Sequence, residues 1–215
     1  KAVFDLTIKA ADGQEIISGT PISSSEVQQG NKIITFDTTP KMSTYLLEFV
    51  LGDLHKKSTT TKDGVEVSVW ATKAQTSELF DFPLDIAVRV LEFYEEYFGV
   101  KFPLKKCDHV ALPDFASGAM ENWGLITYRE SALLAGQKSA LSSKRHVALV
   151  IAHETAHQWF GNLVTMKWWD DLWLNESFAT MMEYFSVDAI EPSWNIWQEF
   201  SVNEAILSLR RDAID

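Results

Sequence analysis

Short runs in which apolar and polar residues alternate dominate the first quarter of the chain. Such runs lie at residues 3–8, 33–36 and 45–51, and Gly, Pro and Ser residues separate them. Alternation with a period of two is typical of strands that bury one face. The pattern therefore predicts an antiparallel sheet within residues 1–53.

A polar stretch at residues 56–64 interrupts this pattern. It has no apolar periodicity, and it ends in the turn signal Asp63-Gly64. We expect a linker or a hairpin loop here, at a boundary between two domains near Leu54. Residues 1–53 would then form one unit and residues 54–215 another.

The apolar spacing becomes helical further along the chain. Residues 76–98 carry apolar side chains at helical spacing, followed by Gly99 as a helix end, and most of the chain from Ser142 onward has the same period. Strand-like runs remain at residues 65–70, 109–112 and 125–128. Strands first and helices later favour an α+β fold.

Composition narrows the possible partners. The 215 residues carry a formal net charge of -11, which disfavours nucleic acid and anionic membranes but tolerates a cationic group such as a peptide amine. The single cysteine, Cys107, excludes an internal disulfide and favours a reducing compartment. We expect a cytoplasmic location, with a membrane-anchored ectodomain as the alternative. No apolar run approaches the roughly 20 residues that span a bilayer.

The strongest chemical signal is His153-Glu154-Thr155-Ala156-His157, in a helix predicted to end at Gly161. Residues four apart lie on one helix face, so both imidazoles can reach one zinc ion. Catalytic zinc usually takes three protein ligands and leaves one position for water. A third ligand must therefore come from elsewhere in the chain.

Glu176 is the candidate for that third ligand. Eighteen residues separate it from His157, enough for a loop and the first turn of a second helix. Glu154 follows the first histidine directly and is the candidate general base, because a carboxylate there can take a proton from the activated water. Glu183 lies seven residues after Glu176 and can support a ligand histidine by a hydrogen bond.

These residues, preceded by Gly118-Ala119-Met120-Glu121-Asn122, resemble the aminopeptidase N family of gluzincin zinc peptidases. The resemblance implies the closing strands of an N-terminal β domain, followed by the first part of a thermolysin-like catalytic domain with one zinc ion. It also implies that Gly118 and Ala119 hydrogen-bond the substrate backbone and that Met120 lines the first side-chain pocket. Glu121 would bind the free α-amine of a peptide, making the enzyme an exopeptidase.

Part of the family's machinery falls outside this sequence. The resemblance implies further amine-binding residues from earlier in the N-terminal domain, an oxyanion-stabilising tyrosine beyond Asp215, and a helical domain that closes the cleft. The chain starts at Lys1 within a strand-like pattern and stops after a helical one, so we expect a piece of a longer polypeptide. By itself it should bind zinc but turn over poorly.

Two other functions fit the same residues. A thermolysin-type endopeptidase would use the same histidines and glutamates without needing a free amine, and a binding scaffold would hold the metal without turnover. Among the remaining aromatic and basic residues, we expect His146 to be solvent-facing or structurally satisfied. The tryptophans at positions 159, 168, 169 and 173 are expected in the core.

Overall fold

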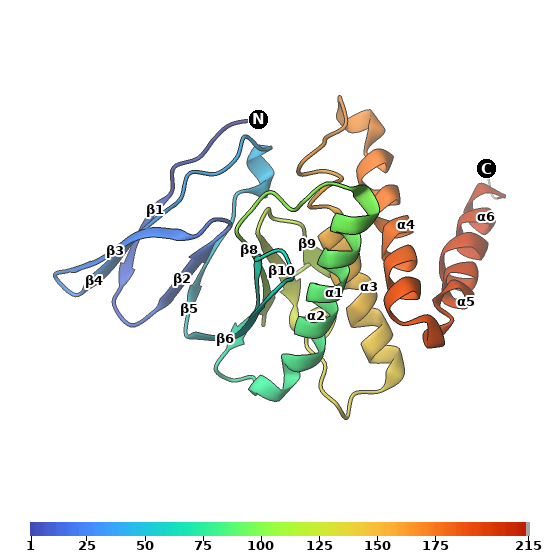
Figure 1. Ribbon diagram of the computed structural model, residues 1–215, viewed down its shortest axis with the longest axis horizontal. Coiled ribbons are helices and arrows are strands. Elements are labelled where there is room, and N and C mark those ends of the chain that lie inside the picture. Colours follow the sequence, from blue (N-terminus) through green and yellow to red (C-terminus); the bar gives the residue numbers. More distant parts are fainter. Residues whose placement is uncertain (214–215) are drawn as a thin grey trace.

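The first strands form two small antiparallel sheets. The computed structural model describes residues 1–213, which leaves the last two positions of the predicted catalytic domain outside the described residues. The first sheet has the order β1-β4-β3 and the second pairs β2 with β5. Their bounds are β1 Thr7–Ala11, β2 Glu15–Ser18, β3 Ile22–Gln28, β4 Asn31–Phe36 and β5 Phe49–Gly52 (Figure 1). The predicted antiparallel arrangement is confirmed, and the boundary at residues 53 and 54 stays a prediction.

One of the predicted strands is wrong in its first half. Residues 45–51 were expected to be extended throughout, but Thr44–Leu46 forms a 3-10 turn, η1, and only Phe49–Gly52 is a strand. The turn places Leu46 in the core, where it is almost fully buried. Burial of this side chain overrides the alternating pattern of the segment.

A mixed five-stranded sheet forms the centre of the molecule. Its order is β6-β7-β8-β10-β9, with β7, β8 and β10 parallel to one another and both outer strands antiparallel to their neighbours. The bounds are β6 Leu54–Thr60, β7 Glu66–Thr72, β8 Lys106–Leu112, β9 Ala119–Met120 and β10 Leu125–Arg129. The short β9 is thus the last strand on one side of this sheet.

The polar stretch at residues 56–64 is mostly a strand, contrary to the expected linker or loop. Leu54–Thr60 pairs along its whole length with β7, and only the segment from Thr61 to Gly64 turns the chain back, closed by the Gly64 N–H donating to the Thr61 carbonyl. As the outermost strand of the sheet, β6 exposes most of its side chains. Polar residues are therefore compatible with pairing there, and charged side chains suit an edge strand.

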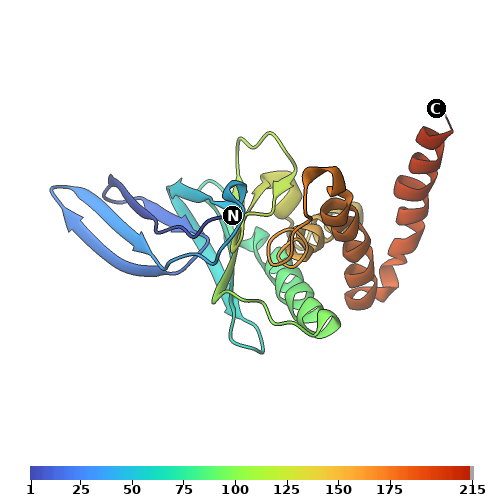
Figure 2. The same cartoon turned by 90° about the horizontal axis from the view of Figure 1, so that it is seen from above.

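The helices lie together on one side of the central sheet, and the two small sheets lie on the other (Figures 1 and 2). They are α1 Asp81–Phe98, α2 Glu130–Leu133, α3 Leu141–Ala156, α4 Trp173–Ile190, α5 Ile196–Phe200 and α6 Ile206–Asp212. Gly99 follows α1 in a left-handed conformation, as predicted. The α+β class is confirmed, and none of the helices within residues 1–213 has the length and apolarity needed to cross a membrane.

One apolar core joins the sheet to α1, α3 and α4. It buries side chains from every layer, among them Val67, Ile86, Ile151 and Val187. The buried Tyr94 of α1 adds a polar link, because its hydroxyl lies 3.0 Å from both the Ala152 carbonyl of α3 and the Ser186 hydroxyl of α4. These contacts hold α3 and α4 side by side.

The tryptophan prediction holds at only one of four positions. Trp159 is buried, whereas Trp168, Trp169 and Trp173 are exposed around the start of α4. The three exposed rings lie in the loop before α4 and in its first turn, where the side chains do not pack into the core. Cys107 is buried as a free thiol, and burial raises its pKa to about 12.

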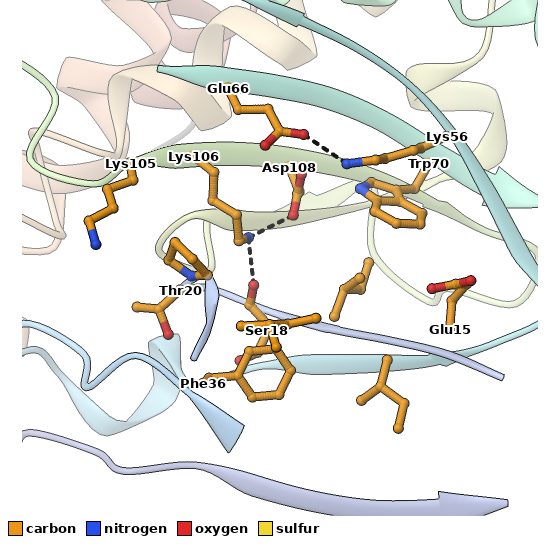
Figure 3. Close-up of a pocket in the computed structure, with 14 residues that line it drawn as sticks. Glu15, Ser18, Thr20, Phe36, Lys56, Glu66, Trp70, Lys105, Lys106 and Asp108 are labelled. Atoms are coloured by element: carbon orange, nitrogen blue, oxygen red, sulfur yellow. Dashed lines mark hydrogen bonds and ion pairs between the residues drawn. The ribbon is translucent and has the colours of Figure 1, made fainter. Parts of the chain in front are cut away.

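Lys106 connects the small sheets to the central sheet. Its ammonium donates to the Ser18 carbonyl and to Asp108 Oδ2, both at 2.6 Å, and to the Gly124 carbonyl at 3.1 Å. Figure 3 shows this lysine beside a cavity of about 390 Å³ between the two parts. The Lys106 side chain is only 13% exposed and that of Asp108 only 4%, so each charge depends on the other.

Replacing Lys106 should therefore destabilise the protein. In Lys106→Met, the buried Asp108 carboxyl group loses its cationic partner, and we expect a loss of roughly 3 kcal/mol in the free energy of unfolding. The matched control is Lys105→Met, because Lys105 pairs with Asp37 while 80% exposed and should matter by less than about 1 kcal/mol. Urea unfolding of both variants measures this difference, and equal effects would contradict the structural role of Lys106.

Candidate metal centre

The two motif histidines lie at the end of α3. His153 is in the last turn of the helix, and His157 follows its final residue while keeping a helical conformation. The sequence predicted that this helix ends at Gly161, but it ends at Ala156. Beyond it the chain turns tightly, with the Asn162 N–H donating to the His157 carbonyl and the Gly161 N–H to the Val164 carbonyl.

Glu176 lies opposite these histidines in the first turn of α4, where the sequence placed it. The Nε2 atoms of His153 and His157 are 3.0 Å apart, and Glu176 Oε2 is 3.4 Å from each. Their ligand atoms form a group in which all lie within 4.8 Å of one another. The structure therefore brings the three predicted ligands together from two packed helices.

Both imidazoles are oriented through their other nitrogen. His153 Nδ1 lies 2.8 Å from Glu183 Oε2. His157 Nδ1 lies 3.0 Å from the Phe160 carbonyl and 2.6 Å from Asn175 Oδ1. A carbonyl or carboxylate oxygen can only accept, so each Nδ1 carries a proton and each Nε2 is the nitrogen that faces the other two ligands.

This arrangement fits a metal ion. Two imidazole Nε2 atoms and a carboxylate oxygen meet at one point, and with both Nε2 atoms deprotonated they form a set of three ligands for a cation. Burial disfavours a charged His153, but hydrogen bonds to Glu176 and Glu183 outweigh it and raise its pKa to about 10. The pKa of Glu176 is lowered by its hydrogen bonds with both histidines. The surroundings thus favour positive charge at the point where the ligands meet.

Gly161 fits against the group that orients His157. A Cβ atom at this position would lie 2.3 Å from Asn175 Oδ1, and the residue has a φ of +118° that side chains rarely adopt. Only glycine allows the turn after α3 to pack this closely on α4. The asparagine before Glu176 had no sequence signal, because its role depends on this packing.

Glu154 lies within the site, with a carboxylate oxygen within 4.8 Å of a ring nitrogen of His157, but it is not one of the three converging ligands. Its side chain is buried, and its Oε2 atom has no hydrogen-bond partner within residues 1–213. Burial raises the pKa of Glu154 to about 7, although His153 and His157 pull it down. A buried carboxylate with a free acceptor atom can take a proton from a water or substrate molecule.

The Gly118–Asn122 motif forms the wall beside this carboxylate. Ala119 and Met120 make up β9, and the Gly118 carbonyl accepts a hydrogen bond from the Arg129 N–H at 2.9 Å. The Glu121 side chain is buried and belongs to a second group of possible ligand atoms, with Glu154 and His157, that lie within 4.8 Å of one another. The motif therefore lies next to the candidate metal centre.

Tyr45 is a further residue at this site that the sequence reasoning missed. Its hydroxyl donates to Glu121 Oε1 at 3.1 Å. Burial and the nearby charge of Glu121 raise the pKa of Tyr45, so its hydroxyl stays protonated. His146, by contrast, is exposed as expected and lines a cavity of about 750 Å³ that also borders His153.

Two histidines one helical turn apart, a glutamate from the next helix and a buried carboxylate beside them are the arrangement of zinc metallopeptidases. Comparison of the sequence with protein families agrees with this class. The Peptidase family M1 domain matches residues 82–215, and the Peptidase M1 N-terminal domain matches residues 1–46. The chain belongs to peptidase family M1.

Similar proteins cover the whole chain. Aminopeptidase N of Lactococcus lactis subsp. lactis is 59% identical and Aminopeptidase N of Lactobacillus helveticus is 53% identical, each over 100% of this chain and 26% of the relative. Puromycin-sensitive aminopeptidase of Caenorhabditis elegans is 46% identical, over 100% of this chain and 23% of its own length. The chain thus spans about a quarter of the length of these relatives.

Loss of the group that orients His157 should weaken metal binding. In Asn175→Ala the imidazole loses its shortest Nδ1 contact, and we expect zinc affinity to fall roughly 10- to 100-fold. Competition with a chromophoric zinc chelator gives the affinity directly. The neighbouring exposed Ser177 supplies the control, because Ser177→Ala should bind zinc as tightly as the unmodified protein. Unchanged affinity in Asn175→Ala would show that Phe160 alone holds the ring.

Proposed function

We propose that this chain is the metal-binding and base-supplying part of a zinc aminopeptidase. The observation that carries this proposal is the meeting of the His153, His157 and Glu176 ligand atoms beside Glu154 and Glu121. Membership of peptidase family M1 and the names of the relatives support the same activity. Peptides with a free N-terminal amine are the proposed substrates.

His153, His157 and Glu176 would hold one zinc ion. Zinc in such a site supplies Lewis acidity, which activates water and polarises a carbonyl. Glu154 would take the proton from the attacking water and pass it to the amine that leaves when the peptide bond breaks. Glu183 would keep His153 in the tautomer that leaves Nε2 free for the metal, and Asn175 would do the same for His157.

The β9 segment would bind the substrate. Because β9 is the last strand of the central sheet, an extended peptide can lie beside Gly118 and Ala119 and pair with their backbone. Met120 would border the first side-chain pocket. Glu121 would accept charge-assisted hydrogen bonds from the protonated α-amine, a charge that an internal peptide nitrogen does not have.

Three features of the complete enzyme are proposed to lie outside this chain. The first is the tyrosine that stabilises the oxyanion, expected beyond Asp215. The second is the set of further amine-binding residues, expected in earlier parts of the N-terminal domain. The third is the helical domain that closes the cleft. The rest of a longer polypeptide would contribute both. A cytoplasmic location remains a prediction.

A substrate pair with and without a free amine tests the proposal. The complete natural polypeptide that contains this sequence should hydrolyse an aminoacyl reporter at least about 100-fold faster than its N-acetylated form, because acetylation removes the charge that Glu121 binds. The 215-residue chain alone should bind zinc and hydrolyse the reporter poorly. Equal cleavage of both reporters would support an endopeptidase instead, and zinc binding without turnover by the complete polypeptide would support a scaffold.

Glu154→Gln separates the base from the metal ligands. Glutamine keeps the size of the side chain but accepts no proton, so we expect hydrolysis to fall by roughly 10²- to 10⁴-fold. Zinc content should stay the same, because Glu154 is not among the three ligands. Metal analysis and reporter hydrolysis on the same preparation measure both, and loss of zinc in this variant would reassign Glu154 as a ligand.

A further inference from the structure

The segment before the central sheet places a side chain in the proposed amine site. Tyr45 lies on the η1 turn, three residues after Met42 and next to Leu46. Met42 and Leu46 are both buried in the main core, and Met42 also pairs through its backbone with Ala2. The turn that carries Tyr45 is therefore fixed by packing.

The Tyr45 ring is also held by a neighbour from the opposite side. Its centroid lies 5.7 Å from that of Trp169, in the loop that leads into α4, with the ring planes tilted by 54°. Aromatic pairs at this distance favour tilted arrangements. The ring thus bridges the N-terminal segment and the start of α4, and its hydroxyl reaches Glu121.

Glu121 needs a donor at this position. Its backbone carbonyl is fixed by Gln158 Nε2 at 3.2 Å and Asn162 Nδ2 at 2.9 Å, but these contacts leave the side-chain torsions free. The carboxylate lies beside Glu154, whose like charge repels it, and close enough to His157 to compete for a metal ion. A hydrogen bond from outside this cluster, such as that from Tyr45, fixes the orientation of the Glu121 carboxylate within it.

We propose that Tyr45 is a positioning residue for the substrate amine: its hydroxyl bonds Glu121 Oε1 and so fixes the carboxylate that receives the amine. This inference rests on the proposed function, because it assigns Glu121 to the amine. It adds that the N-terminal segment, through Tyr45, takes part in recognition of the substrate. The effect of Tyr45 should therefore pass through Glu121 and appear in binding of the free amine.

Tyr45→Phe in the complete natural polypeptide tests this role, since phenylalanine keeps the ring against Trp169 and removes only the hydroxyl. We expect KM for an aminoacyl reporter to rise about tenfold while kcat changes by less than about twofold, because the amine contact holds substrate before and during the reaction. Zinc content should not change. Tyr97→Phe is the matched control, because Tyr97 is an exposed tyrosine of α1 and its variant should keep the original KM.

Combining the change with Glu121→Gln decides whether Tyr45 acts through Glu121. In the Glu121→Gln background, Tyr45→Phe should no longer alter KM, because the carboxylate that it positions is gone. The same rise in both backgrounds, or a fall in kcat at constant KM, would overturn the proposal. A protein that cleaves acetylated and free reporters equally before any substitution would instead refute the proposed aminopeptidase function, so the two failures can be told apart.

Discussion

The convergence of three acceptor atoms from two helices is the constraint on which this site depends. The end of α3 supplies two imidazoles, and α4 supplies the Glu176 carboxylate. The same α4 also supplies Asn175 and Glu183, which orient those imidazoles. A shift of α4 against α3 would therefore displace a ligand and both orienting groups together. The shared core and the Tyr94 hydroxyl prevent such a shift.

Negative charge accumulates around this convergence. Four carboxylates, those of Glu121, Glu154, Glu176 and Glu183, surround two histidines, and Glu121 and Glu154 are buried while Glu176 is 49% exposed. Burial raises the pKa of Glu154 and of Glu183, because a charged carboxylate is costly there. A divalent metal ion and a protonated substrate amine would together balance this charge. The charge of the site would therefore stabilise both cations of the proposed chemistry.

The N-terminal segment is joined to the site by specific contacts. Lys106 of the central sheet donates a hydrogen bond to the Ser18 carbonyl of this segment. Tyr45 of the segment donates one to Glu121, which lies 76 residues further along the chain. Tyr45 lies within the part that matches the Peptidase M1 N-terminal domain, and Glu121 within the part that matches the catalytic domain. The proposed amine site is therefore built at the meeting of the two parts, and its geometry depends on how they pack.

The sequence alone determined the elements whose signals are local. Helical spacing placed His153 and His157 on one face, because that relation follows from the helical period. The eighteen residues from His157 to Glu176, enough for a loop and one turn, placed Glu176 at the start of the next helix. Tertiary structure decided the rest. The polar β6 pairs as an edge strand, and the expected strand at Tyr45 turns because Leu46 enters the core. Asn175 and Tyr45 carry no local signal, since their roles arise only from partners that folding brings beside them.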